Sequence, residues 1–226
     1  KDYETEATEL AALIRRHHPA AVSLLDVGCG TGGHLAGFAQ RFARVTGLDV
    51  SPWMTKIAEG RVPGVAVHEA DMRSFALDDD YDAITCLFSS IGYLTCEQDL
   101  VDTLATFRRH LRPGGIVVVE PWWFPETFLD RYVNSLEVRD GTRTVVRVSH
   151  SVRDGAFSEM QVHYVVAEPQ QGIRHFTDSH RMALFTRDQY EAAFRAAGLS
   201  VDYRATVLVW SAMGGGSLAL PYLELE

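Results

Sequence analysis

A glycine-rich loop after a short apolar run is the first feature of this sequence whose residue types and spacing could do chemistry. Residues 22–27 predict a buried strand, and Gly28, Gly30 and Gly32 follow it at alternate positions. Glycine lets the backbone approach a ligand closely, and the helix expected after the loop offers free N–H groups to that ligand. Two classes of cofactor are bound in this way, dinucleotides and S-adenosylmethionine (SAM).

The spacing of the glycines and the aspartate before them separate these two classes. Dinucleotide-binding loops follow the pattern G-x-G-x-x-G, whereas the glycines here stand at every second position. Asp26 would repel a pyrophosphate but suits the positively charged amino-acid end of SAM, directly or through water. The loop therefore predicts SAM as cofactor and S-adenosylhomocysteine as its product. A nicotinamide oxidoreductase and a glycine turn that binds nothing are the alternatives.

Two more acidic residues stand where a cofactor of this kind needs acceptors. Asp49 ends the second expected strand, about 20 residues beyond the glycines, where an acidic side chain binds ribose hydroxyls. Asp71 and Met72 follow the third expected strand, where a carboxylate can accept the adenine amino hydrogens. The alternatives are a helix-capping role for Asp49 and a solvated loop position for Asp71.

The residues after the fourth expected strand, Phe88, Ser90 and Tyr93, are candidates for both cofactor and substrate contacts. In open α/β sheets the ligand lies outside the carboxyl ends of the strands. Phe88 can therefore cover the cofactor, and Ser90 and Tyr93 can face the substrate. Aromatic residues that only fill the core are the alternative for Phe88 and Tyr93.

Strands and helices alternate through the first half of the chain. This pattern predicts an α/β fold, with a parallel Rossmann-like sheet covered by helices on both faces and joined by right-handed crossovers. Residues 111–115, Leu-Arg-Pro-Gly-Gly, predict the end of the last of these helices. The expected helices are 3–18, 32–42, one that begins at 51–52, and 97–110, and the expected strands are 22–27, 45–50, 65–69, 81–88 and 116–121.

The pattern changes after Pro121 and predicts an antiparallel sheet inserted behind the fifth strand. Alternating runs at 144–149, 159–167 and 173–184 are separated by turn residues at 154–155 and 171–172. After this insertion we expect elements that belong to the first domain again: a helix at 186–198 and strands at 201–203 and 218–225. We therefore expect a SAM-binding domain of residues 1–121 and 186–226, and an insertion of residues 122–185 that contributes to the substrate site.

Composition narrows the classes of partner. The 226 residues carry a net charge of −9, which argues against binding to nucleic acid or a membrane but allows a small anionic substrate met by a few arginines. No apolar run approaches the roughly 20 residues that span a bilayer. Cys29, Cys86 and Cys96 show no metal-binding spacing, so we expect no metal and a reducing, cytoplasmic setting. The first residue is not methionine, as expected if the chain starts within a longer protein.

Several stretches together resemble class I SAM-dependent methyltransferases and, more narrowly, TDP-aminosugar N-methyltransferases of the desosamine and mycaminose type. The glycine loop is shared by the whole superfamily, whereas Glu-Pro-Trp-Trp-Phe-Pro-Glu and Arg-Val-Ser-His-Ser are much narrower. The resemblance covers residues 1 to 203 and is carried by residues 24–32, 71–73, 88–94, 118–126 and 147–151.

The resemblance implies that a sugar amine attacks the SAM methyl group, in two successive rounds, to give a dimethylamino sugar for antibiotic biosynthesis. Such an amine needs proximity and in-line alignment more than a strong base. Ser89-Ser90 replaces the Asn/Asp-Pro-Pro-aromatic motif that suits planar amines. The implied catalytic residues are Tyr93, Ser90 and Glu120, the cofactor-binding residues are Asp26, Gly28, Cys29, Gly30, Asp49, Asp71, Met72 and Phe88, and the substrate-binding residues are Trp122, Trp123, Arg147 and His150.

The resemblance also implies that Arg147 meets the substrate pyrophosphate and that Tyr93, a histidine in some relatives, positions the amine or accepts its proton. It implies a homodimer with the inserted sheet as its surface. Each candidate side chain has a structural alternative: the tryptophans can cap the sheet, Arg147 can be an exposed strand residue, and His150 can be structural.

The chain departs from the family pattern at both ends. The family's N-terminal segment, whose tyrosines close over the ligands, precedes the position where this chain begins. The family's C-terminal Gly-Pro-Ser-Gly-Arg-Gly-Leu-Phe corresponds to residues 205–216, which contain no arginine. Either the phosphates are held otherwise or the substrate differs. A small-molecule O-methyltransferase with a histidine base and an inactive SAM-binding partner protein remain alternatives.

Overall fold

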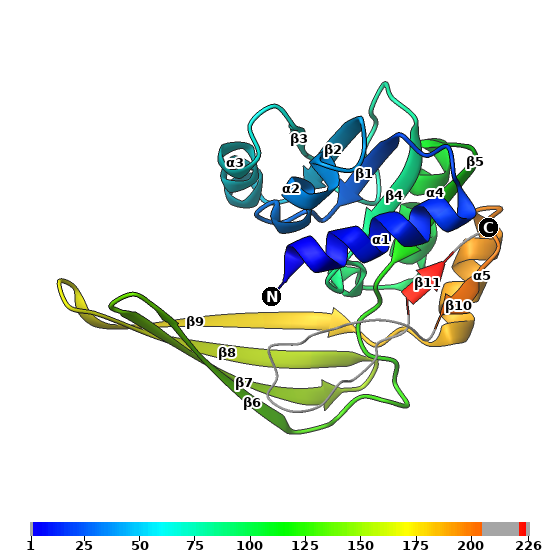
Figure 1. Ribbon diagram of the computed structural model, residues 1–226. Coiled ribbons are helices and arrows are strands. Elements are labelled where there is room, and N and C mark those ends of the chain that lie inside the picture. The colour runs from blue at the N-terminus through cyan, green and yellow to red at the C-terminus, as the bar shows by residue number, and fades with distance from the viewer. Residues whose placement is uncertain (1, 205–221, 225–226) are drawn as a thin grey trace.

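The computed structural model describes residues 2–204 and 222–224, and the fold consists of two sheets (Figure 1). The larger sheet has the strand order β10-β11-β5-β4-β1-β2-β3, and the smaller, lying below it in the view of Figure 1, has the order β6-β7-β8-β9. Strands β5, β4, β1, β2 and β3 are parallel, and β11 runs antiparallel to β5. The larger sheet thus confirms the predicted Rossmann-like α/β class.

Helices and strands alternate along the first half of the chain as the sequence predicts. The helices are α1 (Tyr3–His17), α2 (Gly33–Ala39), α3 (Pro52–Arg61), α4 (Glu97–Arg109) and α5 (Arg187–Ala196), with a short 3-10 helix η1 (Ser90–Tyr93). The strands of the larger sheet are β1 (Ser23–Val27), β2 (Arg44–Asp49), β3 (Ala66–Glu69), β4 (Tyr81–Cys86), β5 (Leu111–Val119), β10 (Asp202–Arg204) and β11 (Tyr222–Glu224).

Two apolar clusters pack on the two faces of the larger sheet. Successive strand residues point to opposite faces, so Leu24 joins the cluster formed with α1, α2 and α3, whereas Leu25 joins the cluster formed with α4 and α5. All five residues of β1 are buried. Burial on both faces explains why the central strands lack the regular alternation of apolar and polar residues.

Local signals start the helices where the sequence predicts. Ser51 caps α3 and accepts a hydrogen bond from the Met54 N–H, with Pro52 in the first turn. Thr186 caps α5 in a reciprocal capping box with Gln189. These contacts satisfy backbone N–H groups that have no partner inside the helix.

Strand β5 starts earlier than predicted. The Leu-Arg-Pro-Gly-Gly segment, read as a helix stop, instead forms the beginning of the strand, because Leu111 pairs with Tyr81 of β4. Ile116 then pairs with Ala83, so the segment bulges between the two pairs, and Gly114 takes a positive φ of 76°. Helix α2 is also shorter than predicted, ending at Ala39.

The smaller sheet contains one strand that the sequence analysis missed. Its strands are β6 (Tyr132–Asp140), β7 (Arg143–Asp154), β8 (Phe157–Glu168) and β9 (Gly172–Ala183), all antiparallel to their neighbours. β6 has a weak alternation of its own, but pairs with β7 along its full length through a turn at Gly141. Pairing with a long neighbour, rather than local pattern, makes it a strand.

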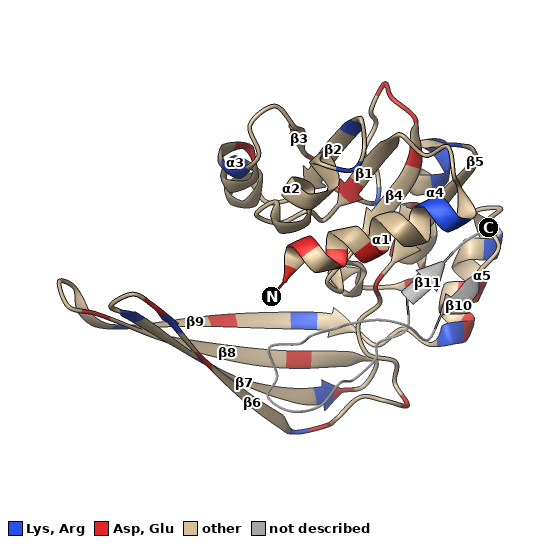
Figure 2. Ribbon diagram, viewed as in Figure 1, with Lys and Arg blue, Asp and Glu red and all other residues tan. Residues whose placement is uncertain are grey.

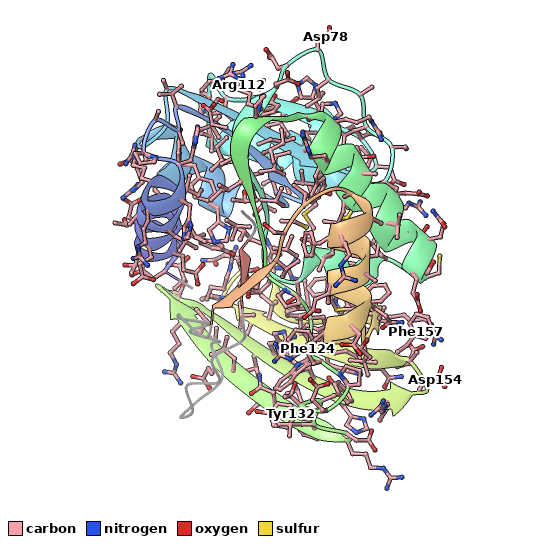
Figure 3. All side chains as sticks on the ribbon, turned by 90° about the vertical axis from the view of Figure 1, so that its right-hand side faces the viewer. Asp78, Arg112, Phe124, Tyr132, Asp154 and Phe157 are labelled. Carbon is pink, nitrogen blue, oxygen red and sulfur yellow. The ribbon has the colours of Figure 1, made fainter. Side chains whose placement is uncertain are left out.

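The chain enters the smaller sheet through a buried aromatic anchor. Phe124 is 1% exposed and lies beneath α5 (Figure 3). Its ring packs edge-on against Tyr190, with centroids 6.1 Å apart, and the Arg187 guanidinium carbon lies 4.0 Å from its centroid. This contact joins the segment between the two sheets to the helical layer of the larger one.

Charged residues stand on both sheets and on the helices in the described part of the chain. Figure 2 shows acidic positions on the first turns of α1, and lysines and arginines spread over several elements. No helix among the described residues is long and apolar enough to cross a membrane.

Candidate active site

The glycine loop crosses the carboxyl edge of the larger sheet between β1 and α2. Gly28, Gly30 and Gly32 have φ values of 69°, 55° and 76°, a region that side chains with a Cβ rarely adopt. The Gly28 and Cys29 N–H groups donate to the Leu48 carbonyl at 2.7 and 3.0 Å. A Cβ on Gly28 would lie 2.7 Å from the side chain of Ser90. The loop therefore requires glycine both for its conformation and for its close packing.

Asp49 ties the loop to the second strand. Its Oδ2 accepts a hydrogen bond from the Gly30 N–H at 2.8 Å, and its Oδ1 accepts one from the Ser51 N–H at 2.9 Å. The side chain is half-buried. Each carboxylate oxygen has a second lone pair, so the group can hold the loop and still accept from a ligand hydroxyl. The helix-cap alternative is partly correct, since one oxygen does serve the start of α3.

Three carboxylates converge on the end of the central strands. Asp26 is 2% exposed and accepts a hydrogen bond from the Thr85 hydroxyl at 2.8 Å. Burial raises the pKa of the Cys86 thiol, and the negative charges of Asp26, Glu120 and Asp49 raise it further. These charges therefore act on one small region. A sulfonium and an ammonium group are both positive, so they fit a site with these three carboxylates.

The third strand contributes an acidic loop next to the glycines. Asp71 forms a salt bridge with Arg73 at 2.6 Å, and hydrogen bonds from that guanidinium lower the pKa of Asp71. The methyl group of Met72 lies 4.0 Å from the Cβ position at Gly28. Of the two predicted adenine-side residues, Met72 therefore stands beside the glycine loop.

The loop after β4 bends sharply. Phe88 and Ser89 have positive φ values of 51° and 63°, and Phe88 is 62% exposed. Glu120, only 4% exposed, accepts a hydrogen bond from the Phe88 N–H at 2.7 Å. The bend therefore presents the Phe88 ring at the site while Glu120 supports its backbone.

Ser90 packs against the glycine loop. Its hydroxyl lies 2.9 Å from the Leu87 carbonyl and 3.3 Å from the Gly28 carbonyl, and donates to these backbone acceptors. The predicted contact with substrate therefore competes with a structural one. Tyr93, at the other end of η1, is 50% exposed and bonds to His180 of β9 at 2.7 Å. This hydrogen bond connects the smaller sheet to the loop that follows β4.

One face of the smaller sheet, here called the inner face, lies against η1. Antiparallel pairing places Tyr132, Ser151, Met160 and His180 in one row across the four strands on this face. Ser149, Ser151 and Met182 on the inner face are buried, whereas Val148 on the opposite, outer face is 40% exposed. The inner face therefore forms one wall of the site.

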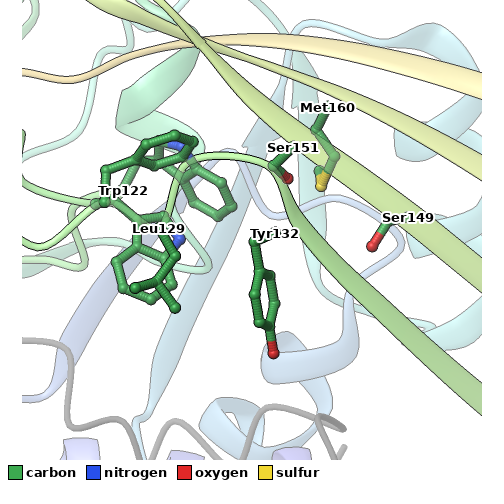
Figure 4. A pocket seen from close by; sticks show the side chains of 8 residues that line it. Trp122, Leu129, Tyr132, Ser149, Ser151 and Met160 are labelled. Atoms are coloured by element: carbon green, nitrogen blue, oxygen red, sulfur yellow. The ribbon is translucent and has the colours of Figure 1, made fainter.

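A small pocket lies between the inner face and the segment that follows β5. Figure 4 shows Trp122 and Leu129 on one side, Ser149, Ser151 and Met160 on the other, and Tyr132 between them. The Trp122 indole N–H donates to the Ser158 hydroxyl at 2.7 Å. The residues that line the pocket are Trp122, Trp123, Phe128, Leu129, Tyr132, Ser149, Ser151 and Met160.

Arg147 borders this pocket. Its guanidinium donates to the Ser149 hydroxyl at 3.1 Å and lies 3.9 Å from the Met160 sulfur, and both residues line the pocket. No carboxylate in residues 2–204 or 222–224 forms an ion pair with Arg147. Its charge is thus available to an anion.

Comparison with known proteins identifies the family. Residues 24–115 match the model of a methyltransferase domain. Over 203 residues the chain is 53% identical to dTDP-3-amino-3,6-dideoxy-alpha-D-glucopyranose N,N-dimethyltransferase of Streptomyces fradiae, covering 90% of this chain and 80% of that protein. It is 51% identical to dTDP-3-amino-3,4,6-trideoxy-alpha-D-glucopyranose N,N-dimethyltransferase of Streptomyces venezuelae, covering 90% and 86%.

The chain belongs to the SAM-dependent aminosugar N-methyltransferases. The crystal structure of DesVI from Streptomyces venezuelae matches it with a TM-score of 0.93 and 47% identity, covering 100% of this chain and 92% of that one. The SAM-bound structure of CalS10, an amino pentose methyltransferase from Micromonospora echinaspora, matches with a TM-score of 0.88 and 42% identity, covering 100% and 91%. SAM is the cofactor, as the glycine spacing predicts.

The structure separates two residues that the sequence analysis had grouped in the methyltransferase site. Arg147 and His150 differ by three positions on one strand, so they point to opposite faces of the sheet. Arg147 lies on the inner face with Ser149 and Ser151, whereas His150 pairs with Val133 and Gln161 on the exposed outer face. Residues of one short motif are close in the chain, but alternate side chains of a strand point to opposite faces of the sheet.

Sequence reasoning also missed members of the site. Tyr132 lies on the unpredicted strand β6, so no local pattern indicated it. Met160 and His180 lie on predicted strands, and the alternation of β8 and β9 could have placed them on one face once their register was known. Residues 205–216, where the family carries an arginine, lie outside the described residues.

Proposed function

We propose that this methyltransferase transfers the SAM methyl group to the amine of a TDP-activated amino sugar. The observation that carries the proposal is that an acidic edge for the cofactor occurs together with an arginine that forms no ion pair with a carboxylate of the described residues. Asp26, Asp49 and Glu120 form an acidic edge suited to the cationic cofactor, and Arg147 borders a pocket suited to an anionic substrate. The curated relatives act on dTDP-3-amino and dTDP-4-amino sugars by name.

The residue roles follow from this arrangement. The glycine loop and Asp49 would bind the amino-acid and ribose parts of SAM, and Asp71 with Met72 the adenine. Trp122 and Trp123 would pack against the sugar nucleotide, and Arg147 would pair with a phosphate oxygen. Glu120 and Ser90 would support the loop that presents Phe88 and Tyr93. Residues 122–185 would form the insertion that completes the substrate site.

Product analysis tests the proposed reaction. The protein is incubated with SAM and a panel of TDP-3-amino and TDP-4-amino sugars, and products are examined by mass spectrometry with fragmentation. We expect methyl groups on the sugar nitrogen. Methylation on oxygen would instead establish an O-methyltransferase, and SAM binding without any methylated product would indicate an inactive relative.

Asp49→Ala is expected to weaken SAM binding by about 1–3 kcal/mol, roughly 5- to 150-fold in Kd, through lost hydrogen bonds to the ribose and the loop. Calorimetric titration measures the change. Asp49→Asn keeps one acceptor oxygen and should lose less, which separates acceptor loss from loop disorder. Unchanged SAM affinity in Asp49→Ala would refute the ribose role.

We also propose a homodimer that forms through the outer face of the smaller sheet. Four aliphatic residues on this face are exposed: Val133 at 62%, Val148 at 40%, Val165 at 38% and Ile173 at 77%. An exposed apolar sheet face favours self-association. Val148→Glu should therefore give a monomer in sedimentation velocity. Val138→Glu, on the inner face and 49% exposed, is the matched control, and equal masses for the two variants would contradict the proposal.

The setting proposed for the enzyme is a reducing cytoplasm. Cys29, Cys86 and Cys96 are all unpaired, and two of them are buried. The net charge of −9 supports a small-molecule substrate over nucleic acid or a membrane surface.

A further inference from the structure

A chain of three polar side chains runs from the site into the smaller sheet. The Tyr93 hydroxyl lies 2.7 Å from Nδ1 of His180, and Nε2 of the same ring lies 3.4 Å from Oδ2 of Asp178. Asp178 and His180 are two positions apart on β9, so both lie on the inner face. Strand β9 is the strand of its sheet nearest to the larger sheet (Figure 1).

The position of Asp178 favours a proton on one of the two histidine nitrogens. A carboxylate beside Nε2 favours the tautomer protonated there, which leaves Nδ1 as an acceptor. The Tyr93 hydroxyl must then donate to Nδ1. Its oxygen lone pairs remain free of that bond and can accept a hydrogen from a substrate amine. The Ser179 N–H binds the other oxygen of Asp178 at 2.8 Å and holds the carboxylate in place.

Tyr93 is presented to the cofactor edge by its own short helix. Ser90 at the start of η1 packs on the Gly28 position, and Gly92 packs against Trp122 and Met182. Burial raises the pKa of Tyr93, with smaller contributions from the charges of Asp178, Tyr164 and Asp49.

We propose that Tyr93, His180 and Asp178 form a proton relay for the methyl acceptor, with His180 as the final proton acceptor. A sugar ammonium gives its proton to the Tyr93 oxygen as the Tyr93 O–H proton passes to Nδ1 of His180. The N–H bond of the ammonium and the phenol O–H bond break, a new O–H and a new N–H bond form, and the phenol stays neutral. The imidazolium pairs with Asp178, and the amine lone pair is freed to attack the methyl group.

This relay rests on the proposed aminosugar function and adds two residues that act through Tyr93. Tyr93 touches the substrate, whereas His180 and Asp178 set its proton position. The charged and titratable groups in contact with His180 are Asp178 on its own strand and Tyr93 on η1. Asp178, Tyr164 on β8 and Asp49 on the larger sheet act in turn on Tyr93.

His180→Gln tests the relay through its pH profile. Single-turnover rates with saturating SAM are measured from about pH 6 to about pH 9 with a TDP-amino sugar that the wild-type enzyme methylates. We expect a roughly tenfold loss of rate near neutral pH that shrinks as pH rises, because a substrate amine that is already neutral needs no relay. A merely structural role would lower the rate equally at every pH.

Two further variants and one control complete the test. Tyr93→Phe should show the same pH-dependent loss, and the double variant with His180→Gln should lose no more than Tyr93→Phe alone. Asp178→Asn, at a side chain 59% exposed and therefore tolerant of change, should lose about threefold. Ser179→Ala alters the residue between them, whose side chain points to the outer face, and should match the wild type.

The outcomes distinguish the relay from the proposed function. No methylation of any amino sugar by the wild-type enzyme would overturn the function on which the relay rests. Wild-type methylation with unchanged pH profiles in His180→Gln and Asp178→Asn would overturn the relay alone. Additive losses in the double variant would also overturn it, because they would show that Tyr93 and His180 act independently.

Discussion

Gly28→Ala is expected to reduce SAM affinity by roughly 100-fold, with turnover falling in parallel at limiting cofactor. Alanine at a φ of 69° costs about 1–2 kcal/mol, and its Cβ would stand 2.7 Å from the Ser90 side chain. Overpacking of this kind typically costs about 1–3 kcal/mol. The loop can relieve both only by moving away from the position that binds the cofactor. Calorimetric titration with SAM measures the loss.

Three companion variants separate the causes. Gly28→Ala with Ser90→Gly removes the collision and leaves the backbone strain, so part of the affinity should return. Gly30→Ala, whose Cβ meets no atom within 4 Å, carries strain alone. Gly60→Ala, in helix α3 with open space around it, should bind SAM normally. Wild-type affinity in Gly28→Ala would show that the loop does not approach the cofactor.

Asp82→Ala is expected to lower the free energy of unfolding by about 3 kcal/mol or more. Asp82 is 5% exposed, and its Oδ2 accepts hydrogen bonds from the Val22 N–H, the Ser23 N–H and the Ser23 hydroxyl at 2.8–2.9 Å. Arg112 pairs with its other oxygen at 3.1 Å. Removal leaves several buried donors without an acceptor, at about 1–3 kcal/mol each before relaxation. Urea unfolding measures the change.

The same carboxylate gives a pH dependence of stability. Burial by itself raises the pKa of Asp82, but hydrogen bonds from Val22, Ser23 and Arg112 outweigh it and lower the pKa from 3.8 to about 2. Because the folded-state pKa is lower than the unfolded one, the stabilisation is complete above about pH 4 and is lost as pH falls toward 2. The difference corresponds to about 2 kcal/mol.

Asp82→Asn should therefore remove this acid dependence. Its unfolding free energy should lie closer to that of the wild-type protein at low pH than at neutral pH. Asp79→Asn, at a side chain 62% exposed and paired with Arg44, is the control and should change stability by less than about 0.5 kcal/mol. Equal loss in the two variants would refute the role of Asp82 in joining β1 to β4.

The predicted cofactor half of the site rests on local signals. The Asp26–Gly32 loop and Asp49 follow directly on apolar strands, and parallel strands bring their carboxyl ends to one edge. The hydrogen bonds of Asp49 with Gly30 and Ser51 could not be predicted from the sequence pattern. The residue predicted to bind the ribose also holds the loop.

The substrate half depended on pairings that no local pattern specifies. Strand β6 was missed because its alternation is weak and its pairing with β7 makes it a strand. The contact between His180 and Tyr93 could not be predicted, because it forms where β9 packs against η1 and the two residues are 87 positions apart in the chain. Arg147 and His150 lie on opposite faces of the sheet, although they are only three positions apart in the chain.

The sequence by itself determined the cofactor, the family and the order of strands and helices in the larger sheet. Those properties rest on residues close together in the chain, where glycine conformation, helix caps and apolar periodicity act. The tertiary structure alone decided which side chains share a wall: Tyr93 with His180 and Asp178, and Arg147 with Trp122 and Met160. The physical reason is that register and packing between distant strands set those distances, and a shift of one residue would send each side chain to the other face.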